Sequence, residues 1–380
     1  MKICIFTASR SEYGLLKGLI KKIHLIKNAK LSLVVSGSHL STKYGLSINE
    51  IKKDKFKINK KIYINLEKDS NWDVANAFAE TSKKINKYFK SKKFDLVILL
   101  GDRYEALSVA ISSYINRFPI AHIHGGEKTL NSLDDNFRHS ISKLSTFHFV
   151  SHISNKKRLI QLGEDKKKIF VVGGLGSNQI HDIKLYNKKK LEKELGINLS
   201  SKTVIINIYN EIYNTNRVTN ALLNLFKIIK KHNQIMFIFT LPSHDVNSNL
   251  LKRKILSFKK NTSNCKVFAN LGIKKYYSLL KYSSLVIGNS SSGILEVPSF
   301  GIYTINIGTR QRGRIFSKSI VLSNYNDIGL ERKILKYIKK KHKFKNPYYK
   351  KDTYEKIVNI IKSVTKKPLL YKEFIDLKNI

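Results

Sequence analysis

Cysteine is scarce in this 380-residue chain, in which only Cys4 and Cys265 occur. Two cysteines cannot build a disulfide framework or a cysteine-based metal site, so we expect a reducing, cytoplasmic location. Long apolar runs are also missing, and none approaches the roughly 20 residues of a membrane-spanning helix. The first apolar segment is followed at once by Arg10 and Glu12, too early for a signal-peptide core. We therefore expect no membrane partner.

Acidic residues are few as well. The chain has 71 Lys and Arg against 27 Asp and Glu, a formal net charge of +44. Such an excess is typical of nucleic-acid-binding proteins. The lysines are scattered over predicted helix faces and loops, for example at 21–22, 52–53, 166–168 and 188–190. We interpret them as a solvated basic surface and expect no nucleic-acid partner. The electrostatic field of this positive charge would still favour a negatively charged substrate.

Short apolar runs alternate with longer segments of helical period. The runs are almost continuously apolar, as expected for parallel strands covered on both faces. In the first half we predict the strands Lys2–Phe6, Leu31–Ser36, Leu96–Leu100, Ile120–Ile123, Phe147–Val150 and Ile169–Val172. Helices are predicted between them, including Leu15–Ile26, Asn71–Phe89 and Arg103–Ile115. A second series of strands comprises Thr203–Ile208, Met236–Thr240, Val267–Phe268, Leu285–Ile287 and Thr304–Ile307.

Two series of alternating strands and helices predict an α/β protein with two Rossmann-like, doubly wound domains. We place the domains at 1–175 and 176–353, with Gly173–Asn178 as the hinge. A last segment, 354–380, contains a predicted helix that could pack back on the first domain. In such sheets ligands bind beyond the carboxyl ends of the strands, so we expect the site in an interdomain cleft.

Polar residues follow the first predicted strands. Arg10 lies where a strand turns into a helix, and there free N–H groups and a guanidinium can face an anion. Asp102 directly follows a buried strand and could act as an acid or a base. The alternatives are an ordinary turn with a surface arginine and an aspartate that caps a helix.

The stretch 122–139 holds most of the ionisable candidates. His124 and Glu127 flank two glycines, which let a ligand approach the backbone closely. Asp134 and Arg138 lie one turn apart on one face of a predicted helix. A single histidine is usually structural, and a His/Asp set could also hold a metal, but no fixed ligand spacing supports one, and we expect none. The candidate catalytic residues are Asp102, His124, Glu127, Asp134 and Arg138.

In the second half, a small-residue turn with Ser290 and Ser291 follows a strand. Hydroxyls and turn N–H groups suit a diphosphate, although neither a P-loop nor a Gly-x-Gly-x-x-Gly pattern is present. Glu296, one turn further, could bind a ribose hydroxyl; a tight turn with a serine cap is the alternative. Arg310 begins a loop with three arginines at alternate positions, which could clamp phosphate or form a solvated basic loop.

Six motifs in this order resemble the hydrolysing UDP-N-acetylglucosamine 2-epimerases, which open the sialic and legionaminic acid pathways. The resemblance spans residues 5 to about 315, and six ordered motifs are more specific than any one. The motifs are Ser-Arg-Ser-Glu-Tyr-Gly-Leu-Leu, Gly-Asp-Arg-Tyr-Glu, His-Ile-His-Gly-Gly-Glu, Asp-Asp-x-x-Arg-His, Gly-Asn-Ser-Ser-Ser-Gly-x-x-Glu and Asn-Ile-Gly-Thr-Arg-Gln-x-Gly-Arg.

The resemblance implies a GT-B fold and a two-step reaction without a cofactor. A base removes the sugar C2 proton while UDP leaves, and water then adds to the glycal with inverted configuration at C2. The substrate would be UDP-N-acetylglucosamine or a related UDP- or GDP-linked amino sugar, and the product a free sugar of the ManNAc type. Besides the catalytic residues, the family pattern assigns nucleotide binding to Arg10, Arg103, Ser290, Ser291, Glu296 and Arg310. We also expect a homo-oligomer, either a dimer or a tetramer.

The chain departs from the family pattern at two places. Tyr209 stands where many members have a histidine, and we assign it to nucleotide binding. Ser243 stands in a segment that reads Pro-Asn-x-Asp-x-Gly in the family. A GT-B glycosyltransferase that uses a nucleotide-sugar donor is the alternative function, and a basic module for nucleic acid or acidic glycans is a non-enzymatic one.

Overall fold

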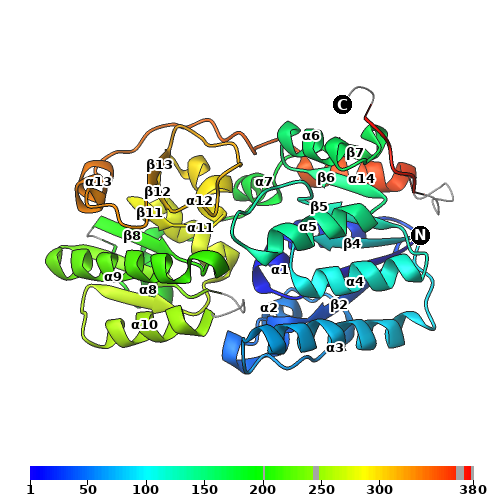
Figure 1. The fold of residues 1–380 in the computed structure, drawn as a ribbon, viewed down its shortest axis with the longest axis horizontal. Coiled ribbons are helices and arrows are strands. Elements are labelled where there is room, and N and C mark those ends of the chain that lie inside the picture. Colours follow the sequence, from blue (N-terminus) through cyan, green and yellow to red (C-terminus); the bar gives the residue numbers. More distant parts are fainter. Residues whose placement is uncertain (200–201, 243–247, 365–371, 378–380) are drawn as a thin grey trace. The chain divides into compact units, whose positions relative to one another are not determined.

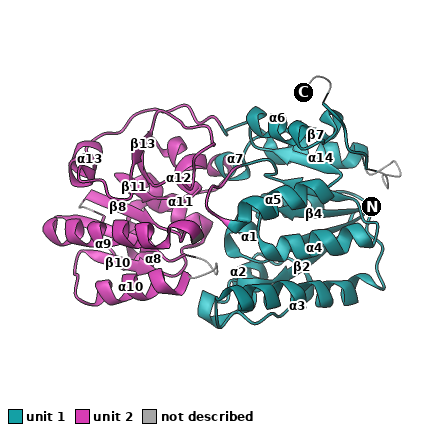
Figure 2. Cartoon of the chain, viewed as in Figure 1, with its two compact units in different colours: residues 1–127, 133–179, 348–380 teal, residues 128–132, 180–347 magenta. Residues whose placement is uncertain are grey.

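The computed structural model describes residues 1–199, 202–242, 248–364 and 372–377 (Figure 1). The chain forms two compact units (Figure 2). Unit 1 comprises residues 1–127, 133–179 and 348–380, and unit 2 comprises residues 128–132 and 180–347. The departure from the family pattern at Ser243 lies outside the described residues.

Unit 1 is built on a parallel sheet in the order β3-β2-β1-β4-β5-β6-β7. Its strands are β1 (Lys2–Thr7), β2 (Lys30–Ser36), β3 (Ile58–Ile62), β4 (Leu96–Leu100), β5 (Ile120–Ile123), β6 (Phe147–Val150) and β7 (Ile169–Val171). Its helices are α1 (Arg10–His24), α2 (Ile48–Lys53), α3 (Asn71–Phe89), α4 (Tyr104–Ile115), α5 (Leu133–Leu144), α6 (Ile153–Gln161), α7 (Leu175–Asp182, which crosses the unit boundary) and α14 (Thr353–Val364).

Both faces of this sheet are buried, which explains why its central strands are almost entirely apolar. Because side chains alternate along β1, Ile3 and Ile5 join a core with α1 and α14, whereas Cys4 and Phe6 join a core with α3 and α4. Helix α14 packs on α1, and the Tyr354 hydroxyl donates to the Leu15 carbonyl at 3.0 Å. The sheet thereby holds the carboxyl ends of β4 and β5 in a rigid frame.

Unit 2 has a parallel sheet in the order β10-β9-β8-β11-β12-β13. Its strands are β8 (Lys202–Asn207), β9 (Ile235–Thr240), β10 (Cys265–Phe268), β11 (Leu285–Gly288), β12 (Tyr303–Ile307) and β13 (Ile320–Ser323). Its helices are α8 (Lys188–Leu195), α9 (Thr215–Lys231), α10 (Ser248–Lys260), α11 (Gly272–Tyr282), α12 (Ser292–Leu295) and α13 (Leu330–Tyr337). Val204 and Ile206 face the core under α9, and Ile205 faces the core under α11.

The predicted class, two doubly wound α/β domains, is confirmed, and each predicted strand is present within two residues of its predicted ends. The sequence patterns missed two of the four edge strands of these sheets, β3 and β13. They also placed the first helix too late: it begins at Arg10, where Ser9 and Glu12 form a capping box. No helix within the described part of the chain is long and apolar enough to cross a membrane.

Candidate active site

Two of the predicted catalytic residues form an ion pair in unit 1. Asp102 follows β4, and Arg138 in α5 donates to Asp102 Oδ2. Arg138 also donates to Asp135 Oδ1 at 2.9 Å and to the Glu127 carbonyl at 3.0 Å. Only 1% of Arg138 is exposed, so two carboxylates balance a buried cation. The side chains of Asp102 and Asp135 are 27% and 19% exposed, so both can meet a substrate.

Asp135 is a site residue that the sequence analysis missed. We predicted Asp134 on the same helix face as Arg138. Residues three apart on a helix are also neighbours, and Arg138 forms an ion pair with Asp135. Asp135 Oδ2 also lies 3.7 Å from His139 Nε2. Asp134 is half-buried in the same first turn of α5. The doubled acid at the start of α5 was the signal that could have identified Asp135.

His122 links β4 to α5 next to this cluster. Its Nε2 lies 2.7 Å from the Gly101 carbonyl, which can only accept, so Nε2 carries the hydrogen and Nδ1 accepts from the Ser142 hydroxyl at 2.9 Å. Burial lowers the pKa of His122 to about 3. A Cβ on Gly125 would lie 2.8 Å from Ser142 Oγ and 2.9 Å from His122 Nδ1, so a larger residue there would displace these side chains.

His124 and Glu127 form a buried pair at the end of β5. His124 Nδ1 lies 3.2 Å from Glu127 Oε1, which also accepts from the Ser151 hydroxyl at 2.7 Å. The other ring nitrogen, Nε2, accepts from the Leu175 N–H at 3.2 Å. His124 has a φ of +66°, a conformation that costs a non-glycine residue about 1–3 kcal/mol and is found at functional sites. Because the lone pair of Nε2 already accepts this hydrogen bond, the His124 ring would have to move away from the Leu175 N–H before Nε2 could take a proton from a substrate.

The predicted phosphate-binding arginines of unit 1 lie on neighbouring elements. Arg10 begins α1, and Arg103 immediately precedes α4. Arg103 Nε lies 3.0 Å from Glu105 Oε2 and 3.9 Å from Glu12 Oε1. Burial raises the pKa of Glu12 to about 7, although Arg103 and the Ala8 N–H oppose this rise. Arg103 is thus already engaged by carboxylates, and its role toward a nucleotide stays a prediction.

In unit 2, Asn289 joins three of the predicted nucleotide-binding segments. Its amide accepts from the Tyr209 N–H at 2.8 Å and donates to the Tyr209 carbonyl at 2.9 Å. The Asn289 carbonyl accepts from Arg310 Nη1 at 3.3 Å, and the Arg310 guanidinium lies 5.3 Å from the centre of the Tyr209 ring. Ser290 and Ser291 continue this turn, and Ser290 Oγ accepts from the Ser292 N–H at 3.3 Å. The structure therefore brings Tyr209, the serine turn and Arg310 together.

Glu211 is a second residue that the sequence analysis missed. It is fully buried and accepts from the Tyr325 hydroxyl at 2.5 Å, from Asn289 Nδ2 at 3.1 Å and from Asn131 Nδ2 at 3.5 Å. Asn131 Nδ2 also donates to Thr309 Oγ1 at 2.8 Å. The carboxylate thus ties together the loops that carry Tyr209, the serine turn and Arg310. Its place two residues beyond Tyr209, after a buried strand, was the only signal for it.

Glu296 immediately follows α12 and is 6% exposed. It lies four residues beyond Ser292, whose hydroxyl is 3.0 Å from that of Tyr276. Its contact with a ribose stays a prediction. Among the described residues there is no group of three or more His, Cys, Asp or Glu side chains that could hold a metal ion.

The family model and the curated relatives that match this chain agree on one family. The model of the UDP-N-acetylglucosamine 2-epimerase family matches residues 21–362. The chain is 40% identical, over 86% of its length and 85% of the relative's, to the hydrolysing GDP/UDP-N,N'-diacetylbacillosamine 2-epimerase of Campylobacter jejuni. It is 35% identical to the polysialic acid biosynthesis protein P7 of Escherichia coli, over 99% of this chain and 97% of that protein.

Solved structures share the fold. The UDP-N-acetylglucosamine 2-epimerase of Neisseria meningitidis bound to UDP-GlcNAc has a TM-score of 0.79 at 19% identity, over 96% of this chain and all of that chain. The enzyme of Methanocaldococcus jannaschii in complex with UDP-GlcNAc and UDP has the same TM-score, identity and coverage. At this level of identity the likeness shows the two-domain architecture alone.

Proposed function

The chain belongs to the UDP-N-acetylglucosamine 2-epimerase family, and we infer from this that it is a hydrolysing nucleotide-sugar 2-epimerase. We propose that its substrate is a UDP- or GDP-linked N-acetylated amino sugar, either UDP-N-acetylglucosamine or a diacetamido sugar. The observation that carries the proposal is the 40% identity, over 86% of the chain, to an enzyme named as a hydrolysing GDP/UDP-diacetylbacillosamine 2-epimerase. We propose a place in sialic or legionaminic acid biosynthesis, and the name of the polysialic acid relative supports the first of these.

The reaction consumes one water and yields a nucleoside diphosphate and a free sugar. In the first step a base takes the proton from C2, the C1–O bond to the diphosphate breaks, and a C1–C2 double bond forms. In the second step a proton is added to C2 from the opposite face, and water supplies the hydroxyl at C1. Positioned acid and base groups of this kind accelerate a reaction by about 10²–10⁴-fold.

We assign the proton transfers to unit 1. Asp102 is the most accessible carboxylate among the partners of Arg138, and the ion pair with Arg138 holds it in place. Asp134 and Asp135 supply further carboxylates on the same helix turn. The buried pair of His124 and Glu127 is the other acid–base candidate; it can take part if the ring leaves the Leu175 N–H.

We assign the nucleoside diphosphate to unit 2, with Arg10 and Arg103 as further phosphate candidates. The hydroxyls of Ser290 and Ser291 and the guanidinium of Arg310 are donors for a leaving diphosphate, whose developing charge fixed donors stabilise. Tyr209 lies against Arg310 and offers a ring for stacking. We propose that Glu296 binds a ribose hydroxyl. None of these contacts needs a metal or an organic cofactor.

Two further properties remain proposals. The cysteines Cys4 and Cys265 are buried and unpaired, which supports a reducing cytoplasm. We also propose a homo-oligomer, dimer or tetramer, which multi-angle light scattering would test.

The test of function is incubation with nucleotide sugars without any acceptor. A hydrolysing epimerase releases nucleoside diphosphate and free sugar, whereas a GT-B glycosyltransferase leaves the donor intact until an acceptor is added. The close relatives do not favour the glycosyltransferase. Tight, salt-sensitive DNA binding without turnover would instead indicate a basic binding module.

A further inference from the structure

The carboxyl-terminal tail holds the end of helix α5. The Lys372 ammonium donates to the carbonyls of Ser142 and Ser145, at 3.0 and 2.6 Å, and to Glu164 Oε2 at 2.6 Å. The last carbonyls of a helix lack partners within it, and the negative end of the helix dipole favours a cation there. Lys372 therefore caps α5 from a segment more than 220 residues away in sequence.

The ammonium group is the most buried part of this tail, and the Phe374 ring adds a contact with Lys143 of α5, whose Nζ lies 4.2 Å from the ring centre. The Lys372 side chain is only 14% exposed, whereas Phe374 and Ile375 remain 60% and 42% exposed. One backbone bond, from the Ile375 N–H to the Gly163 carbonyl at 3.0 Å, supports it. Loss of the ammonium should therefore remove the two bonds to the end of α5 and loosen the tail there.

The Glu164 carboxylate has partners other than Lys372. His148 Nε2 lies 2.8 Å from Glu164 Oε2, and Lys143 Nζ lies 3.2 Å from Oε1, so two other cationic or donor groups already serve this carboxylate. Burial lowers the pKa of Lys372 to about 8, which means that the buried ammonium is costly. What Lys372 alone adds is the pair of bonds to the end of α5.

Helix α5 connects this end to the acid–base cluster. The Ser142 hydroxyl bonds to His122, and His122 bonds to the Gly101 carbonyl, next to Asp102. One turn before Ser142 along α5, Arg138 forms the ion pair with Asp102. Asp102 and its neighbour Gly101 are thus connected to α5 at two points, through Arg138 and through His122 and Ser142. We therefore expect a displacement of the end of α5 to move Arg138 relative to Asp102.

We propose that Lys372 is a positioning residue for the epimerase reaction, because it holds α5 and so fixes Arg138 and its carboxylate partners against Asp102. This role rests on the function proposed above. The alternative is that Lys372 only fastens the tail, in which case its loss leaves the cluster unchanged.

The first test is steady-state turnover of Lys372→Ala, with Lys362→Ala as the control on an exposed lysine of α14. We expect kcat to fall about tenfold or more and KM to stay within about twofold, since small misplacements of catalytic groups mainly slow the chemical step. Lys372→Arg, which keeps the donors, should recover most of the loss. If Lys372→Ala does not fold, Lys372→Met keeps the aliphatic stem and tests the ammonium alone.

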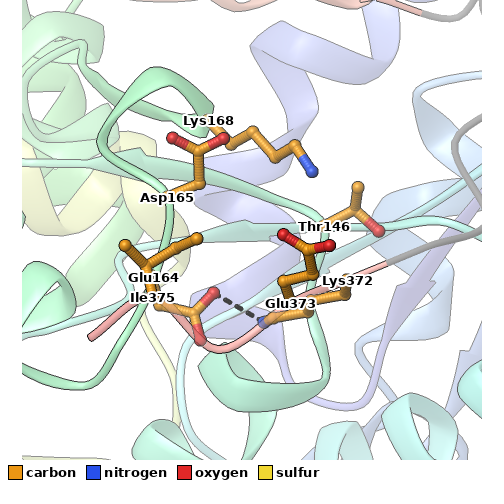
Figure 3. A pocket seen from close by; sticks show the side chains of 7 residues that line it. All are labelled: Thr146, Glu164, Asp165, Lys168, Lys372, Glu373 and Ile375. Carbon is orange, nitrogen blue, oxygen red and sulfur yellow. Dashed lines mark ion pairs between the residues drawn. The ribbon is translucent and has the colours of Figure 1, made fainter.

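Chemical rescue separates positioning from general loosening. A cavity of about 190 Å³ adjoins Lys372 (Figure 3), and its lining residues are Thr146, Glu164, Asp165, Lys168, Lys372, Glu373 and Ile375. Ethylammonium should restore kcat of Lys372→Ala, whereas tetramethylammonium at the same concentration, which has no N–H donor, should not. Equal effects of the two ions would contradict the proposal.

Amide hydrogen exchange tests the contact between Lys372 and the end of α5 without any substrate. Amides 139–145 should exchange faster in Lys372→Ala than in the wild type, and Lys362→Ala should leave them unchanged. If the wild type turns over nucleotide sugars and Lys372→Ala matches its kcat, the positioning role is wrong. If the wild type shows no turnover, the proposed function is wrong. Unchanged exchange of amides 139–145 in Lys372→Ala would separately show that Lys372 does not hold α5.

Discussion

Replacement of His122 by glutamine should remove a large part of the acid sensitivity of unit 1. The His122 ring is fully buried and neutral, with Nε2 donating to the Gly101 carbonyl and Nδ1 accepting from the Ser142 hydroxyl. A second proton would have to go on Nδ1, which would remove its acceptor and place a charge in the core. Glutamine can keep a donor toward Gly101 but does not titrate.

The size of the effect follows from the two pKa values. Burial lowers the pKa of His122 from 6.5 to about 3, so below pH 6.5 the unfolded chain binds a proton that the native state does not. The contribution of His122 to stability therefore falls as the pH falls. Linkage between pKa values of 6.5 and about 3 gives a loss of about 2 kcal/mol in the free energy of unfolding from pH 8 to pH 5.

The assay is equilibrium urea unfolding, followed by circular dichroism at several pH values between 8 and 5. His122→Gln will be less stable than the wild type at pH 8, but it should lose about 2 kcal/mol less on acidification. His24→Gln, at an exposed position at the end of α1, is the matched control. Groups present in both proteins cancel in the comparison. Parallel pH profiles for His122→Gln and the wild type would refute the buried neutral histidine.

Three other predictions concern the site. Asp102→Asn and Asp134→Asn should each lower kcat by about 10²–10⁴-fold with native circular dichroism, and near-normal rates in both would remove the acid–base assignment. Arg310→Ala should mainly weaken UDP or GDP binding, so unchanged affinity in calorimetry would exclude that role. Burial raises the pKa of Glu12 from 4.5 to about 7, so this group contributes about 2 kcal/mol of added stability as the pH falls from 8 to 5, opposite in sign to the contribution of His122. Glu12→Gln should therefore lose about 2 kcal/mol more than the wild type on this acidification, and parallel urea profiles for the two proteins would show that Glu12 is not the group responsible.

Buried parallel strands were predictable from the sequence, because burial on both faces leaves a continuous apolar run, as in β4. Two of the edge strands, β3 and β13, were not. β3 reads Ile-Asn-Lys-Lys-Ile, and β13 leaves Leu322 58% exposed, so neither shows the apolar pattern of a central strand. The start of α1 was also missed, because it is set by the capping box of Ser9 and Glu12 and not by apolar period.

The candidate site was predictable as a set of segments but not as a set of contacts. Polar residues after strands pointed to Asp102 and the serine turn, since each of these positions follows the carboxyl end of a strand in its own sheet. Which carboxylate pairs with Arg138 depends on side-chain geometry that spacings of three and four residues do not distinguish. The N–H that occupies His124 comes from Leu175, 51 residues away, and no local pattern shows it.

The central claim is that the chain removes the C2 proton, expels the nucleoside diphosphate and adds water with inversion. Incubation with a panel of UDP- and GDP-linked amino sugars in deuterated water, without acceptor, tests all three steps by NMR. The account predicts free nucleoside diphosphate and a free manno-configured sugar with deuterium at C2. A donor that stays intact, or a free gluco-configured sugar that retains its C2 proton, would contradict it.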